Sequence, residues 1–198
     1  MGNKVSNPVP SYDTVAQLYS TDEIETAKLK FKSMCHQGQN TLRLENFKQV
    51  SNVHPLIQRR LLPRLFEVMD SKKENAIDFE SYFCTLSLLH RSTVDEMAKF
   101  IFILYGTSKS SSLQRDNIRD LLIDSHASVI ESNDDPEVVS RRLKGMADMM
   151  DGMVSLVLLQ HASVPDKLSL SEFCAFVKLD SSVQNLISLL PRCLGENK

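Results

Sequence analysis

A polar segment between two apolar helical stretches, at residues 67–83, most constrains what this chain can fold into. Leu65, Phe66 and Met69 end the first stretch, Asp70 opens the polar segment, and Ile77 stands alone before the second stretch begins. Apolar residues at helical spacing on both sides of a short polar break predict a helix, a loop and a second helix.

The same order of helix, polar loop, single aliphatic residue and helix occurs four times. The aliphatic residues are Leu42, Ile77, Leu113 and Leu168; the first three are almost equally spaced, and a longer interval precedes the fourth. Repetition of one helix–loop–helix unit signals an internal repeat. The longer interval accommodates an added helical stretch.

These units resemble EF-hands, in which a twelve-residue loop supplies oxygen ligands at positions 1, 3, 5, 7, 9 and 12 and carries Gly at position 6. In that family apolar residues stand at positions eight and ten. The loops at 35–46, 70–81, 106–117 and 161–172 fit this frame, with the four aliphatic residues at position eight. The resemblance implies an all-α fold of four EF-hand-like units in two lobes, with short β-bridges between paired loops.

The corresponding division of the chain has four parts. Residues 1–19 form a flexible arm, and residues 20–90 form an N-terminal pair of units. Residues 91–191 form a C-terminal pair with an inserted helix, and residues 192–198 form a tail.

The loop at 70–81 keeps part of a calcium ligand set. Asp70, Glu74 and Asp78 occupy positions 1, 5 and 9, but Lys72 places an ammonium at position 3 and Ser81 offers one neutral oxygen at position 12. Asn75 replaces Gly at position 6, where its tolerance of left-handed backbone suits the turn. We expect the loop shape to persist and micromolar calcium binding to be lost.

The other three loops keep fewer ligands. Loops 35–46 and 106–117 place no carboxylate at the expected ion-facing positions. Loop 161–172 has Glu172 at position 12, but His161, Ser163 and Pro165 stand at positions 1, 3 and 5. Glu172 also suits the start of the next helix, where the helix dipole favours an acid. A residual calcium site at Asp70, Glu74 and Asp78, or at Glu172, is the alternative.

Cap residues and prolines predict several helix boundaries. Capping-box spacing occurs at Ser20/Glu23, Thr93/Glu96 and Ser92/Asp95, and Asp135-Pro136 has the order of an N-cap and a first helical residue. Pro63 is expected in a first turn, Gly152 is a candidate kink, and Pro191 is expected to end the last helix.

The N-terminus matches the myristoylation pattern, with Gly2 as acceptor and Ser6 as the hydroxyl residue. Lys4 is the only basic residue before Lys28, so a single acyl chain would anchor the protein weakly and reversibly. The alternative is an inert tail. The expected location is cytoplasmic and peripheral to a membrane.

Composition and cysteine spacing exclude several classes. A net charge of −2 gives no electrostatic case for nucleic acid. Four widely spaced cysteines indicate reduced thiols rather than a disulfide framework. Cys35 and His36 are neighbours, but no hydrolase, phosphate-binding or zinc-protease motif occurs, so no enzyme activity is expected.

Four of the eight methionines lie within eight residues: Met146, Met149, Met150 and Met153. Methionine suits adaptable grooves that bind an amphipathic helix, and it also fills ordinary cores. The sequence is compatible with both interpretations.

The layout is similar to myristoylated neuronal calcium sensors and calcineurin B-like subunits. It is also similar to the EF-hand-like region that precedes TLDc domains, with residues 182–190 like the end of that region. These resemblances imply a non-catalytic regulatory or adaptor protein that binds a partner helix. The alternative is a calcium sensor with a residual site.

Overall fold

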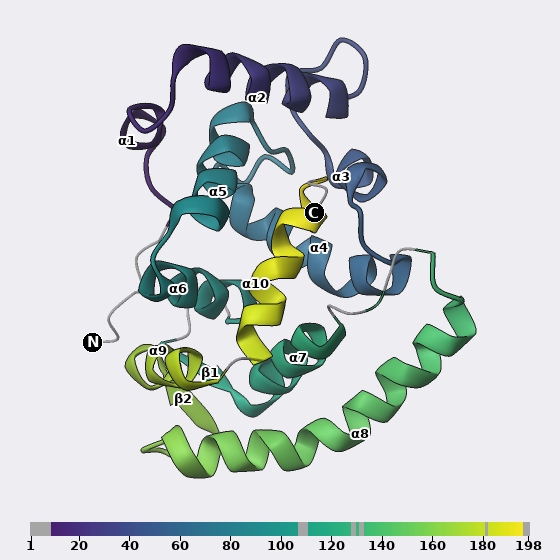
Figure 1. Ribbon diagram of the computed structural model, residues 1–198, viewed down its shortest axis with the longest axis vertical. Helices are drawn as coiled ribbons and strands as arrows, with labels where there is room; N and C mark the ends of the chain where they lie inside the picture. The colour runs from purple at the N-terminus through teal and green to yellow at the C-terminus, as the bar shows by residue number, and fades with distance from the viewer. Residues whose placement is uncertain (1–8, 107–110, 128–129, 131–132, 181, 196–198) are drawn as a thin grey trace.

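A computed structural model describes residues 9–106, 111–127, 130, 133–180 and 182–195, and Figure 1 shows their arrangement. Helices dominate, and two short strands pair with each other. The elements are α1 (Tyr12–Ala16), α2 (Thr21–Met34), α3 (Leu44–Val50), α4 (Pro55–Met69), α5 (Phe79–Arg91), α6 (Val94–Tyr105), β1 (Ser112–Gln114), α7 (Arg115–His126), α8 (Pro136–His161), β2 (Lys167–Ser169), α9 (Leu170–Leu179) and α10 (Ser182–Cys193).

The predicted all-α fold of paired helix–loop–helix units is confirmed. Leu42 and Ile77 form an antiparallel bridge, with N–H···O distances of 2.8 and 2.9 Å. Leu113 and Leu168 face each other in the antiparallel β1–β2 pair. All four side chains are fully buried, so each bridge also joins the apolar cores of its two units.

Side-chain caps begin the helices largely where the sequence predicted. Ser20 with Glu23 and Thr93 with Glu96 form complete capping boxes. The Asp135 carboxylate accepts from the N–H groups of residues 137 and 138, and Pro136 is the first residue of α8. Each of these caps satisfies backbone N–H groups that a helix cannot satisfy itself.

Two predicted helix boundaries were wrong, those at Pro63 and Pro191. Pro63 lies inside α4, on its exposed side, where water can reach the Arg59 carbonyl that Pro63 cannot pair with. α8 continues through Gly152, and α10 continues through Pro191 to Cys193. In all three helices, packing of an apolar face outweighs the local preference for a break.

α10 lies at the centre of the molecule, between α7 and the N-terminal units (Figure 1). It packs against α7 and α5, and its apolar face is almost completely buried: Val183, Leu186, Leu189, Leu190 and Cys193. The Asn52 N–H donates to the Arg192 carbonyl at 2.9 Å, which ties the end of α10 to the segment after α3. One continuous apolar cluster therefore spans both predicted lobes.

An ion network also connects the two pairs of units. Arg60 on α4 donates to the buried Asp124 carboxylate of α7 at 2.8 Å, and the Tyr105 hydroxyl donates to the other oxygen of Asp124 at 2.8 Å. Arg64 pairs with Asp120 and lies over the Tyr105 ring. Burial raises the pKa of Asp124, and the Arg60 charge opposes that effect. A buried carboxylate with two strong donors fixes the relative position of α4 and α7.

Part of the predicted flexible arm forms α1 and packs on α5. Val15 is fully buried, and the Tyr19 ring lies 4.9 Å from the Phe83 ring. Arg91 covers the other side of Tyr19, 4.1 Å from the ring centroid, and donates to the Leu18 carbonyl. Sequence reasoning missed this contact because α1 has only five residues and no clear period.

Candidate functional site

The loop at 70–81 has the expected turn. The Asp70 carboxylate accepts from the Glu74 N–H at 3.1 Å and from the Asn75 N–H at 2.9 Å. Asn75 takes a φ of 56°, the left-handed conformation expected at position 6. The first ligand position therefore organises the loop through backbone N–H groups.

A lysine of the same loop occupies part of its acidic surface. The Lys72 ammonium lies 2.6 Å from the Asp78 carboxylate, and the Ser81 hydroxyl lies 3.1 Å from that of Ser71. Partial burial raises the pKa of Asp78, but hydrogen bonds from Lys72 and Ser81 more than offset this, so its pKa lies below the usual value. With an ammonium on one acid and a hydroxyl at position 12, the residues do not fit a calcium ion in this arrangement.

In the loop at 161–172, the carboxylate at position 12 accepts hydrogen bonds from the loop itself. One oxygen of Glu172 accepts from the Ser163 N–H at 2.7 Å, across the loop. The other accepts from the Ser169 N–H and hydroxyl, both at 2.7 Å, in a complete capping box at the start of α9. Hydrogen bonds from Ser163 and Ser169 lower the pKa of Glu172 to about 2. The carboxylate therefore serves as a helix cap and closes the loop.

The third loop also uses position 12 as a cap. Asn117 stands at the third residue of α7, and its side-chain oxygen accepts from the Gln114 N–H at 3.0 Å. Gly106 opens that loop at a place where a Cβ would lie 2.8 Å from the Phe102 carbonyl. Ser108 and Ser110 lie outside the described residues. In the first loop, at 35–46, Gly38 has a φ of 80°.

The predicted metal residues fall into two separate sites. Asp70, Glu74 and Asp78 share one loop of the N-terminal pair, and Glu172 lies in the C-terminal pair. Within the described residues, no three His, Cys, Asp or Glu side chains gather as a metal cluster.

The four methionines do not line one surface. Met150 is 2% exposed and packs in the core, whereas Met149 is 69% exposed on the outer side of α8. Met146 and Met153 are half-buried between them. The core interpretation holds for Met150, and Met149 belongs to an outward-facing surface instead.

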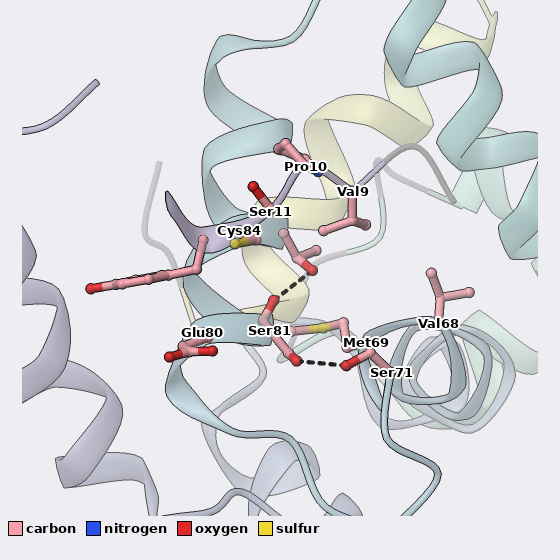
Figure 2. A pocket seen from close by; sticks show the side chains of 11 residues that line it. Val9, Pro10, Ser11, Val68, Met69, Ser71, Glu80, Ser81 and Cys84 are labelled. Atoms are coloured by element: carbon pink, nitrogen blue, oxygen red, sulfur yellow. Dashed lines mark hydrogen bonds between the residues drawn. The ribbon is translucent and has the colours of Figure 1, made fainter. Parts of the chain in front are cut away.

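Figure 2 shows a pocket of about 190 Å³ between the segment that leads into α1 and the loop at 70–81. Ser71 and Ser81 form its floor with Glu80, and Val9, Pro10 and Ser11 cover it. Burial raises the pKa of the Cys84 thiol, which also faces the pocket, to about 11. The pocket thus joins the N-terminal segment to position 12 of the second loop.

The thiols are protonated at neutral pH. Burial raises the pKa of Cys35, the neighbour of His36, and raises that of Cys193 to about 12. All four cysteines are free. A protonated thiol is a poor nucleophile, so this environment does not activate Cys35 for catalysis.

The pairing of helix–loop–helix units through position eight defines an EF-hand-type arrangement, and similarity to known proteins supports the same superfamily. No protein-family model matches the chain. It is 24% identical over 186 residues to a calcium and calcium/calmodulin-dependent serine/threonine-protein kinase of Lotus japonicus, across 93% of this chain and 32% of the kinase. The chain thus spans about a third of the length of the kinases it matches.

Two smaller relatives match about half of the chain. Guanylyl cyclase-activating protein 1 of Gallus gallus is 29% identical over 94 residues, 47% of each protein. A type 2 calcineurin B protein of Dictyostelium discoideum is 23% identical over 106 residues, 53% of this chain and 56% of the relative. These relatives support a regulatory protein of EF-hand type.

Proposed function

We propose that this chain is a non-catalytic, EF-hand-like regulatory or adaptor protein that binds a protein partner, with calcium binding weak or lost. The observation that carries the proposal is the Lys72–Asp78 ion pair, which places a positive charge of the protein among the retained acids of the second loop. The intact bridges between paired loops support a scaffold that keeps its shape without an ion.

Calorimetric titration of the full chain with calcium tests this proposal. We expect binding weaker than about 10⁻⁵ M, the weak end of the range for calcium sensors. Tighter binding would overturn it. A parallel magnesium titration separates a specific site from general attraction of cations to an acidic surface.

The second candidate is a calcium sensor with a residual site in loop 70–81 or loop 161–172. It is favoured by relatives such as the calcium-binding protein NCSA of Dictyostelium discoideum, 25% identical over 104 residues. Under this candidate, Asp70→Ala abolishes any calcium-induced change in helicity, measured by circular dichroism, whereas Glu172→Gln abolishes it if the ion binds the fourth loop. A change that survives both substitutions excludes both sites.

A protein partner is supported by the names of the relatives, which describe an activating protein and a calcineurin component. The partner proposed is an amphipathic helix, the ligand that an EF-hand pair receives in an apolar groove. α10 fills the apolar face between α5 and α7, so such a helix must use another face or displace α10. Affinity purification from cells followed by cross-linking mass spectrometry of the folded wild-type complex distinguishes these two modes. Cross-links from the partner to α5 and α7, with those between α10 and α7 lost, indicate displacement of α10, whereas retained α10–α7 cross-links indicate another face.

Membrane attachment is proposed through myristate on Gly2, which lies outside the described residues. No helix in the described ranges is long and apolar enough to cross a membrane. Co-expression with a myristoyl-transferase should give a chain that sediments with lipid vesicles, and Gly2→Ala should stay in the supernatant. If the wild type and Gly2→Ala sediment equally with the vesicles, the proposed myristate anchor is wrong. The relation to regions that precede TLDc domains stays a prediction.

A further inference from the structure

The outer face of α8 carries large apolar side chains that no part of the described chain covers. Met149 is 69% exposed, Leu156 is 58% exposed and Leu159 is 83% exposed. Figure 1 shows α8 along one edge of the molecule, with the other helices on one side of it. A row of exposed apolar side chains along one helix face is typical of an interaction surface.

Two glycines lie on the same face and alternate with these side chains. Gly145, Met149, Gly152, Leu156 and Leu159 follow one another at intervals of four and three residues, the spacing of a coiled-coil seam. A Cβ built on Gly145 or on Gly152 would meet nothing within 4 Å. Glycine inside a helix costs about 0.5–1 kcal/mol relative to alanine, and here no internal contact requires it.

We propose that this face, termed the α8 seam (Gly145, Met149, Gly152, Leu156 and Leu159), binds the α8 seam of a second copy of the chain in antiparallel orientation. The size pattern selects a second copy as the occupant. Around a two-fold axis between residues 150 and 151, Met149 of one copy lies over Gly152 of the other, and Leu156 lies over Gly145. Leu159 lies opposite Arg142, whose aliphatic stem can pack on it while the guanidinium stays in water. The same seam thus supplies both the projections and the hollows, as an isologous interface requires.

Charges beside the seam permit this self-pairing. The Arg119 guanidinium of α7 lies 3.0 Å from the Asp151 carboxylate, and Arg115 donates to the Asp151 carbonyl and to the Ser155 hydroxyl. At the N-terminal end of the seam, α8 carries three exposed positive residues: Arg141, Arg142 and Lys144. The antiparallel register places them against residues 157–160 of the other copy, which carry no charge, so a second copy brings no like charge against this end.

The length of the seam sets the strength of the association. The seam spans residues 145–159 of α8, about 22 Å of helix at roughly 1.5 Å per residue, and a helix is roughly 10 Å wide, so this face is smaller than the ~800 Å² that each partner buries in a standard stable interface. The dimer is therefore weak and forms at micromolar or higher concentrations of the chain.

Sedimentation velocity of the full chain over a range of concentrations tests the proposal. The wild type should shift from monomer to dimer as concentration rises, and Leu156→Glu should weaken the dimer by roughly tenfold or more. Leu29→Glu is the matched control, since Leu29 is 63% exposed on α2 and lies outside the seam. A monomer at all concentrations, or equal effects of the two substitutions, overturns the proposal.

A second variant separates loss of pairing from loss of folding. Gly152→Leu has free space in the monomer and should keep its thermal stability, but it fills the hollow that receives Met149 of the second copy. We expect it to remain folded and monomeric. A folded Gly152→Leu chain that dimerises like the wild type overturns the proposed register.

Cross-linking tests the antiparallel register directly. A mixture of Met149→Cys and Gly152→Cys chains should form a mixed disulfide under mild oxidation more readily than wild-type chains, which carry their four native cysteines. Mixed cross-links no more abundant than in wild-type mixtures overturn the register.

Discussion

In the loops at 70–81 and 161–172, Asp78 and Glu172 are each held by other groups of the protein, but by groups of different kinds. In the first, the Lys72 ammonium neutralises Asp78, so a positive side chain stands among the ligand positions. In the second, backbone N–H groups and a hydroxyl surround Glu172, and the loop closes around a helix cap. A lysine side chain can be exchanged alone, whereas the second arrangement is part of the backbone path.

The largest expected effect is a gain of calcium binding in the first of these two loops only. Lys72→Asp with Ser81→Glu removes the ammonium and supplies acids at positions 3 and 12, so this double variant should bind calcium at about 10⁻⁵ M or tighter by calorimetry. Ser163→Asp in the fourth loop is the matched change. This variant should bind no calcium, because His161 and Pro165 still occupy ligand positions. Calcium binding by the fourth-loop variant but not by the double variant would contradict this prediction.

The next largest effect concerns the bridge residues, where the two pairs should behave alike. Ile77→Ala and Leu168→Ala each remove a fully buried aliphatic side chain and should lower the free energy of unfolding by about 2–5 kcal/mol in urea denaturation. Leu29→Ala, at an exposed position, should change it by less than about 0.5 kcal/mol. If Leu168→Ala lowered the free energy of unfolding only slightly while Ile77→Ala lowered it strongly, the backbone hydrogen bonds of the β1–β2 pair would be sufficient to hold the C-terminal pair together.

The smallest effect is the contribution of Glu172 to stability. The pKa of Glu172 is lowered from 4.5 to about 2 in the folded chain, so the folded state releases this proton more readily than the unfolded state. Its stabilisation is therefore complete above pH 4.5 and is lost as the pH falls towards 2. Because the side chain is partly exposed to solvent, which screens its charge, we expect a loss of about 1 kcal/mol for Glu172→Gln at pH 7.

Denaturation at pH 7 and at pH 2.5 provides the measurement for Glu172. The difference between wild type and Glu172→Gln should shrink at the lower pH, since protonation removes the same charge. A difference that is constant with pH would mean that the hydrogen bonds of Glu172 add nothing through its charge.

Local signals in the sequence predicted the units but not the way they assemble. Leu42, Ile77, Leu113 and Leu168 each report on their own loop, and the Ser20 and Thr93 caps act within one helical turn. The same holds for Glu172, whose role as a cap was one of two interpretations.

Contacts between distant segments left no such local signal. Arg60 and Asp124 are separated by 64 residues, and neither neighbourhood indicates that the other carboxylate or guanidinium will be buried beside it. The docking of α1 and the central position of α10 depend likewise on surfaces built by other units. The residues of the α8 seam follow a regular spacing in the sequence, but only the structure showed that this face points outward.

The position of α10 has a consequence for biosynthesis. Among the described helices this one comes last in the sequence, yet it completes the core shared by both pairs of units. A nascent chain that has not yet released residues 182–194 from the ribosome leaves the apolar side of α7 open to water and to chaperones, even though its earlier helices can already form. Premature termination upstream of Val183 should therefore yield an insoluble product rather than a shorter working protein.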